Sequence, residues 1–480
     1  MGRTWRLFFI FLLGLGAYGQ DYQESLQVNL VELEVKVQNI GGKFIPNLTR
    51  DDFVVKEAGK VQHIEGLEEI APDKAGNLSR KSRTMILLDL RNTSHPIMSR
   101  LFPQLREYVQ TRYNGRSELG LALYGNGIIE FTEFTSDQQK IFESIDRAET
   151  FFKSNKLRSY GKVGTAGMSI GSENPLHDGD DENLLYRGFI SNHYRFELDV
   201  IGQFIRYLGA WSGKKTVVLI SENWRISDQQ GLETDVDREE VTSLRDIQTA
   251  CLYQKVVINT ISLARSVDHF GDPSGVSLSG RSKRRGDFFS DPGADLASST
   301  SGFSFKVNYR KLAQVLDQTI NKSQHYYLLR YYSKNQGDRF RNVKVSVKGS
   351  GMAFNPDGYY PKRSHISPSH AEATLTQVNE SSLQLEMNTD WLHWGWFGWK
   401  KKQAGYAVSM QLMNEAGQLV SEQVFTGELH KKKEKGGWPG KAISKKLPLN
   451  TKGNKGNRVE LRVIDLTTGK TVVFNQALSY

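Results

Sequence analysis

Apolar and polar residues alternate at the beginning of the chain, and this pattern changes to longer periods after about residue 84. The segment 28–37, VNLVELEVKV, places apolar residues at every second position, which is typical of a strand with one buried face. Gly41 and Gly42 mark one turn, and Ala58 and Gly59 mark a second, hairpin turn. The pattern therefore predicts a small β unit over residues 26–70, followed by a polar stretch without periodicity at 71–83.

Between residues 84 and 322, apolar strands alternate with segments of helical length and period. This alternation predicts an α/β fold, a Rossmann-like and mostly parallel sheet with helices on both faces. A hairpin signal at Gly125-Asn126-Gly127 predicts one antiparallel strand at or near an edge of that sheet. The predicted strands include TMILLDL at 84–90, KTVVLIS at 215–221 and VVINTISL at 256–263, and the predicted helices lie near 95–113, 136–152, 195–211, 236–253 and 309–321.

Alternation returns after residue 322. Residues 324–360 contain two predicted strands, which we expect to pair with strands of 26–70, so that the α/β domain is inserted into the β unit. A polar linker at 361–374 then leads to alternating segments over 375–480, which predict a small β-sandwich domain. Residues 263–302 are rich in Gly, Ser and Asp and are expected to form a long surface insertion.

The first 19 residues have the three-part pattern of a secretory signal peptide. Arg3 and Arg6 precede the apolar run from Leu7 to Leu15, and small residues follow up to Gly19. The alternative is a membrane anchor, but the run is shorter than the roughly 20 residues needed to span a bilayer. We therefore expect an exported chain, periplasmic or secreted, without a transmembrane segment after cleavage.

Charge and the single cysteine narrow the function classes. The formal net charge is +10, with the excess spread between residues 281–287 and the carboxyl-terminal third. No nucleic-acid-binding signature accompanies it, so an anionic envelope surface is a more natural partner than nucleic acid. Cys251 is the only cysteine, which excludes an intramolecular disulfide. The chain has no P-loop or HExxH motif, and we expect no catalytic residues and no enzyme, with a hydrolase without a recognisable motif as an alternative.

Several segments in a fixed order resemble a known family. They are residues 31–64 (VELEVKVQNIGGKFIPNLTRDDFVVKEAGKVQHI), 84–93 (TMILLDLRNT), 204–221 (FIRYLGAWSGKKTVVLIS) and 296–305 (LASSTSGFSF). Together they resemble the VWFA-related family first described from Acidobacteria, a divergent group of von Willebrand factor A-type domains. The resemblance covers about 28–360, and it implies an exported bacterial protein whose α/β domain binds or assembles with a protein partner.

In A-type domains, a divalent cation is held by an Asp-x-Ser-x-Ser loop, a Thr from a second loop and an Asp from a third. The resemblance therefore implies a degenerate metal-ion-dependent adhesion site for Mg²⁺ or Ca²⁺, made of Asp89, Thr93, Thr165 and Glu222. Arg91 stands where the family has its middle ligand, and a guanidinium cannot ligate a cation. The alternative is a metal-free arrangement, in which Asp89 caps the following helix and Arg91 pairs with Glu222.

Two surfaces are candidates for partner binding. The first is the sheet edge with Asp89, Asn92, Thr93 and Glu222, since ligands of α/β sheets usually bind at the carboxyl ends of the strands. The second is the aromatic and basic segment 391–402, WLHWGWFGWKKK, extended by a basic hairpin loop predicted at 431–441. Its tryptophans, at least two of which are expected to be exposed, suit a carbohydrate or an envelope surface, and the candidates are Trp394, Trp396 and Trp399.

Overall fold

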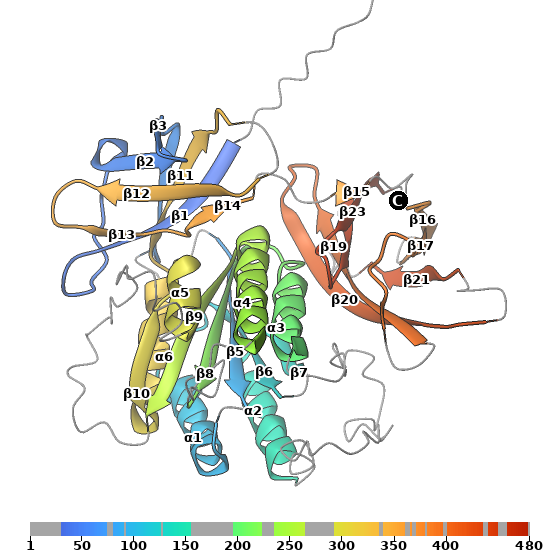
Figure 1. Ribbon diagram of the computed structural model, residues 1–480, viewed down its shortest axis with the longest axis horizontal. Coiled ribbons are helices and arrows are strands. Elements are labelled where there is room, and N and C mark those ends of the chain that lie inside the picture. The colour runs from blue at the N-terminus through green and yellow to red at the C-terminus, as the bar shows by residue number, and fades with distance from the viewer. Residues whose placement is uncertain are drawn as a thin grey trace, which may run out of the picture.

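The computed structural model shows an α/β unit with one β unit above it and another beside it (Figure 1). The central sheet has six strands, and all neighbouring pairs are parallel except β6 with β7. Its order across the sheet is β10 (Ser304–Asn308), β9 (Val256–Ala264), β8 (Lys214–Ser221), β5 (Ser82–Asp89), β6 (Glu118–Tyr124) and β7 (Ile128–Thr135). The structure describes residues 30–73, 80–90, 93–125, 128–154, 195–222, 235–264, 292–335, 339–360, 365–366, 371–379, 382–396, 401–434, 440–449 and 458–478.

This order is that of a doubly wound sheet, in which the chain starts in the middle and winds first to one edge and then to the other. The α/β class predicted from the sequence is thus confirmed. The antiparallel strand predicted from the Gly125 hairpin signal is β7, and it lies at the edge.

Strand β5 shows why the sheet is covered on both faces. Every residue of β5 is buried, and its side chains alternate between two hydrophobic clusters. Met85 and Leu87 belong to the cluster on one face, whereas Ile86 and Leu88 belong to the cluster on the other. A strand that is apolar on both faces needs a layer of helices on each side.

The two helical layers follow from these clusters (Figure 1). Helices α3 (Arg195–Leu208), α4 (Asp235–Gln254) and α5 (Pro292–Ser299) contribute to the first cluster. Helices α1 (His95–Thr111), α2 (Gln138–Lys153) and α6 (Leu312–Ser323) contribute to the second. Local signals fix some helix starts: the Asp137 side chain accepts hydrogen bonds from the backbone N–H groups of Gln139 and Lys140 and so caps α2.

Cys251 lies on α4 and is buried in the first cluster beside the following strand, β9. Burial raises the pKa of its thiol, so the side chain packs as a small apolar group.

The surface insertion predicted over 263–302 is wrong in its last part. Residues 292–299 form α5, and Leu296 packs in the first cluster. Strand β10 follows directly and was also not predicted, although Phe305 and Val307 are buried on either side of the exposed Lys306. Residues 265–291 lie outside the described part of the chain.

The β unit above the sheet is built from strands that precede and follow the α/β unit. One sheet has the order β13 (Met352–Phe354), β1 (Leu30–Gln38), β11 (Tyr326–Tyr332) and β4 (Gly66–Ile70). The other has the order β14 (Gly358–Tyr359), β12 (Arg341–Val347), β2 (Phe53–Glu57) and β3 (Lys60–Gln62). The turn between β2 and β3 has positive φ at Ala58 and Gly59, as a two-residue hairpin turn requires.

This β unit contacts the amino-terminal ends of the central strands. Lys214 at the start of β8 donates a hydrogen bond of 2.6 Å to the Glu34 carboxylate on β1. The neighbouring Lys36 is fully buried, and its ammonium donates to the Ser301 carbonyl and lies 4.7 Å from the centroid of the Phe303 ring. Burial lowers the pKa of Lys36 well below its usual range, and the charge of Lys214 adds to the effect.

The carboxyl-terminal unit is all-β. One sheet has the order β15 (His365–Ile366), β23 (Thr471–Ala477), β22 (Arg458–Asp465), β19 (Lys401–Met413) and β18 (Gly395–Trp396), with β20 (Leu419–Lys432) paired to β19. The other has the order β16 (Thr374–Asn379), β17 (Ser382–Asn388) and β21 (Ala442–Pro448). Apolar residues of both sheets join one hydrophobic cluster. Strand β21 was not predicted, and Lys431, which was predicted to lie in a mobile loop, is a buried residue of β20.

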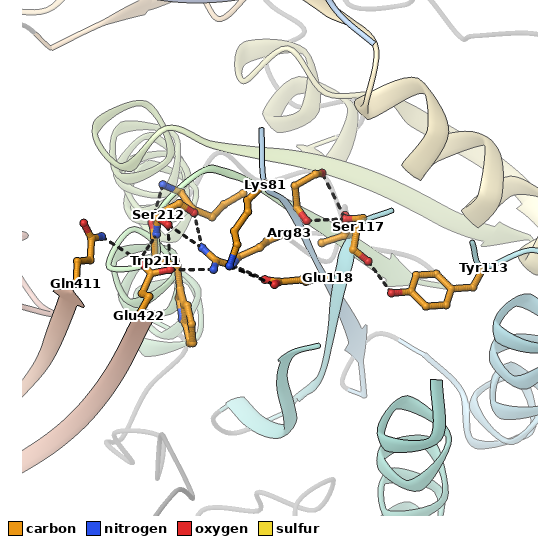
Figure 2. Close-up of polar contacts among 12 residues, drawn as sticks. Lys81, Arg83, Tyr113, Ser117, Glu118, Trp211, Ser212, Gln411 and Glu422 are labelled. Carbon is orange, nitrogen blue, oxygen red and sulfur yellow. Dashed lines mark hydrogen bonds and ion pairs between the residues drawn. The ribbon is translucent and has the colours of Figure 1, made fainter. Parts of the chain in front are cut away.

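A buried arginine joins the carboxyl-terminal unit to the start of β5 (Figure 2). The Arg83 guanidinium lies 2.8 Å from the Glu118 carboxylate on β6 and 2.8 Å from the Glu422 carboxylate on β20. It also donates a hydrogen bond of 2.6 Å to the Ser212 carbonyl and lies 5.0 Å from the centroid of the Trp211 ring. The predicted polar stretch 71–83 is therefore wrong at its end, because β5 begins at Ser82.

Candidate functional site

The carboxyl ends of the central strands form the edge that faces away from the flanking β units. The contacts of Glu34 with Lys214 and of Glu422 with Arg83 both lie at the opposite ends of the strands. Figure 1 shows the arrowhead of β10 pointing away from the β unit that contains β1. This carboxyl edge is therefore the part of the α/β unit that neither of those junctions covers.

Two loops meet at the carboxyl edge through Glu222, which follows β8. The Glu222 carboxylate accepts a hydrogen bond of 2.8 Å from the backbone N–H of Ser94, and its own N–H donates one of 3.1 Å to the Thr93 hydroxyl. Ser94 is the N-cap residue of α1, and its side chain makes no capping hydrogen bond. The carboxylate of Glu222 therefore takes the place of a cap, where the positive end of the helix dipole favours an anion.

The sequence reasoning placed these residues correctly at one edge but misassigned the cap. Asp89 was expected to cap the helix in a metal-free arrangement, whereas the N-cap residue is Ser94 and Glu222 accepts its N–H. Asp89 is the last residue of β5 and is fully buried. Arg91, Asn92 and Thr165 lie outside the described residues, as does the predicted ion pair between Arg91 and Glu222.

The fit of these residues to a divalent cation can be tested on their oxygens. One Glu222 oxygen already accepts the Ser94 N–H, and the Thr93 hydroxyl already accepts the Glu222 N–H. In the described part of the chain, no group of three or more His, Cys, Asp or Glu side chains is placed to hold a metal ion. The described oxygens form a hydrogen-bonded bridge, and because a carboxylate has two oxygens, accepting one hydrogen bond does not prevent Glu222 from ligating Mg²⁺ or Ca²⁺.

The structure describes the side chains of two tryptophans of the aromatic segment, Trp391 and Trp394. Trp391 is buried in the hydrophobic cluster, and its indole N–H donates to the Asn388 carbonyl. Trp394 is half-buried, donates to the Thr389 carbonyl at 2.9 Å, and has the Lys431 ammonium 4.0 Å from its ring centroid.

The Lys431 ammonium therefore covers one face of the Trp394 ring, which removes that face from sugar stacking. The side chain of Trp396 and the whole of Trp399 lie outside the described residues.

One group at the carboxyl edge was missed by the sequence reasoning. Tyr309 and Arg310 follow β10, which runs parallel to β9, so they lie at the same edge as Thr93 and Glu222. Arg100 of α1 contacts Tyr309 there. The alternation Phe303, Phe305 and Val307 could have signalled β10, and with it the position of the residues that follow.

Comparisons with known proteins reach only low similarity. No family model matches the chain, and no curated protein matches it. Among solved structures, proximal thread matrix protein 1 from the mussel byssus is 12% identical with a TM-score of 0.27, covering 54% of this chain and 50% of that chain. An aerotolerance-related membrane protein from Bacteroides fragilis is 13% identical with a TM-score of 0.24, covering 50% of this chain and 99% of that chain.

The manganese-loaded TRAP protein of Plasmodium vivax is 9% identical with a TM-score of 0.27, covering 75% of this chain and 96% of that chain. One structure of the mussel protein has a zinc-occupied MIDAS motif. The matched region spans half the length of the mussel protein. These TM-scores are too low to carry a functional assignment, and the fold class rests on the strand order of the central sheet.

Proposed function

We propose that this chain is a protein-binding or assembly module that binds its partner at the carboxyl edge of an A-type-like α/β unit. The bridge from Glu222 to Ser94 and Thr93 carries the proposal, because it holds the loop after β5 against the loop after β8. Glu222, Thr93 and Ser94 are positioned by these hydrogen bonds, and groups positioned in advance bind with a smaller loss of entropy than mobile ones. The crevice at this edge is also where ligands of doubly wound sheets bind.

We further propose that the chain is exported to the periplasm or secreted, and that it is not an enzyme. Export rests on the signal-peptide pattern of residues 1–19, which lie outside the described part of the chain. No helix in the described residues is long and apolar enough to cross a membrane. The stacking of the two carboxyl-terminal sheets as a β-sandwich is likewise a proposal, supported by their common hydrophobic cluster.

Binding of Mg²⁺ or Ca²⁺ at Asp89, Thr93 and Glu222 stays a prediction, and calorimetry can test it. The full chain would be titrated with Mg²⁺, Ca²⁺ and Mn²⁺ beside an Asp89→Ala variant. Saturable heat that the variant lacks would establish a cation site completed by Thr165. Absence of such heat would favour the metal-free arrangement.

The protein-binding proposal can be tested with peptides selected from a random displayed library on the immobilised full chain. We expect the selected peptides to bind the wild-type chain and to bind Thr93→Val and Glu222→Ala variants at least about fivefold more weakly, since one contact of about 1 kcal/mol corresponds to that factor. Lys344→Gln is the control, because Lys344 is exposed on β12 in the other β unit. Peptides that are insensitive to both edge variants would refute the proposal.

An envelope glycan remains the alternative ligand, bound through Trp396 and Trp399. The described geometry gives it no support at Trp394, because Lys431 covers one face of that ring. Glycan binding that is lost on Trp396→Ala and Trp399→Ala change and unaffected at Thr93 would favour this alternative.

A further inference from the structure

Two arginines converge on one tyrosine hydroxyl at the carboxyl edge. Arg100 on α1 donates a hydrogen bond of 2.7 Å to the Tyr309 hydroxyl, and Arg310 donates one of 3.3 Å to the same oxygen. Their guanidinium carbons lie 5.0 and 5.8 Å from the centroid of the Tyr309 ring. We call these residues, Arg100, Tyr309 and Arg310, the arginine pair site.

Among the described residues, no carboxylate is paired with the positive charges of this site. In the part of the chain that the structure describes, no ion pair involves Arg100 or Arg310. By contrast, Arg106 on the same helix forms ion pairs with Asp146 and Glu149.

The first turns of α1 and α6, which both begin at this edge, contain no acidic residue. Both arginines of the site are exposed, and so is Lys311, the next residue along the chain. A tyrosine hydroxyl is a neutral acceptor, so its contacts with Arg100 and Arg310 neutralise neither guanidinium charge.

The site lies within reach of the bridge formed by Glu222. Arg100 is six residues after Ser94 on α1, which corresponds to about 9 Å along the helix axis. Strands β10 and β5 are separated by β9 and β8, which corresponds to about 14 Å across the sheet. An extended segment of about five residues covers that distance. One short peptide segment can therefore touch both the bridge and the arginine pair site.

We propose that the arginine pair site binds a carboxylate in an acidic segment of the partner protein, with Arg100 and Arg310 donating to its oxygens. Arginine suits this role because its planar fork of donors matches the two oxygens of a carboxylate. The inference rests on the proposed function and names the chemistry of the partner. It also assigns a cationic role at the edge to this chain's own arginines, because Arg100 and Arg310 are exposed there.

The test uses a fluorescein-labelled peptide with four Asp and Glu residues and a second peptide in which these are Asn and Gln. Fluorescence anisotropy with the full chain at low salt is expected to show binding of the acidic peptide alone. Arg100→Gln and Arg310→Gln are each expected to weaken that binding about fivefold, the effect of an exposed charged contact. Arg116→Gln removes the same charge from an exposed arginine before β6, at the opposite end of the sheet, and is expected to leave binding unchanged.

Equal weakening by Arg116→Gln and by the other two variants would overturn the inference, because it would show attraction by net charge alone. Binding of phosphatidylglycerol vesicles that depends on Arg100, without binding of the acidic peptide, would overturn it in favour of a lipid surface. If library-selected peptides depend on Thr93 and Glu222 while the acidic peptide does not bind, the inference fails and the proposed function stands. If substitutions at this edge weaken the binding of neither kind of peptide, the inference and the proposed function both fail.

Discussion

Removal of the Glu422 carboxylate should destabilise the protein far more than removal of a surface glutamate with similar ion pairs. The side chains of Arg83 and Glu422 are 2% and 3% exposed, and their charged groups lie 2.8 Å apart (Figure 2). Glu422 also accepts hydrogen bonds from the Ser212 N–H at 2.7 Å, the Ser212 hydroxyl at 2.9 Å and the Gln411 side chain at 2.9 Å. After Glu422→Ala, Arg83 keeps its hydrogen bond to the Ser212 carbonyl, but its remaining carboxylate partner is Glu118, whose side chain is 28% exposed.

Leaving one partner of a buried ion pair alone costs about 3–5 kcal/mol, which is a large part of the roughly 5–15 kcal/mol that stabilises a typical domain. We therefore expect Glu422→Ala to lower the free energy of unfolding by about 3–5 kcal/mol. The assay is urea unfolding of the full chain, followed by the fluorescence of tryptophan, since Trp211 is buried beside Arg83. Because the chain has several units, unfolding can show more than one transition. The transition that Trp211 reports is the one to compare between the wild-type chain and the variant.

Glu68→Ala provides the control. Glu68 lies 2.7 Å from Arg330 and 3.4 Å from Arg80, but its side chain is 36% exposed. Exposed ion pairs contribute about 0–1 kcal/mol to stability, so Glu68→Ala should barely change the urea concentration at the unfolding midpoint. If Glu422→Ala costs no more than Glu68→Ala, the carboxyl-terminal unit is not joined to β5 through a buried charge, and the reasoning is refuted.

Three further substitutions test other parts of the structure. Burial lowers the pKa of Lys36, so the unfolded chain binds more protons than the folded one between that lowered pKa and about 10.4, and stability should rise with pH there. Lys36→Met should flatten this rise in urea midpoints measured at pH 7 and 9, and an unchanged slope would contradict the burial of the ammonium. Gly302→Ala places a Cβ 1.7 Å from the Ile258 carbonyl and should cost at least about 2 kcal/mol in urea unfolding, whereas Gly440→Ala meets nothing within 4 Å and should be neutral. Glu222→Ala should lower stability by about 1 kcal/mol in thermal unfolding, since it removes the acceptor at the start of α1, and an unchanged midpoint would mean that the helix needs no cap.

The sequence was sufficient where a residue's environment follows from its neighbours in the chain. The apolar run that forms β5 predicts a strand buried on both faces, and its clusters show that arrangement. Hairpin signals also worked, because turn residues determine local backbone geometry. The edge position of Thr93 and Glu222 followed from the rule that parallel strands end together.

Sequence reasoning failed where an environment depends on distant residues. Arg83 looked like part of a polar connection, yet it is buried because Glu118 and Glu422 come to it from two other strands. Strand β10 is only five residues long, its alternation of Phe305 and Val307 was overlooked, and the position of Tyr309 was therefore not predicted. The cap of α1 was misassigned because its acceptor, Glu222, comes from a loop far along the chain.

The most direct test of partner binding at the carboxyl edge is hydrogen exchange of the full chain with and without a saturating library-selected peptide. When the ligand peptide is bound, we expect slower exchange in the segments of this chain that contain Ser94, Glu222 and Tyr309. Exchange in β17 and β22 of the carboxyl-terminal unit should be unchanged. Slower exchange confined to the carboxyl-terminal unit, with the carboxyl edge unchanged, would contradict the proposal and move the binding surface to that unit.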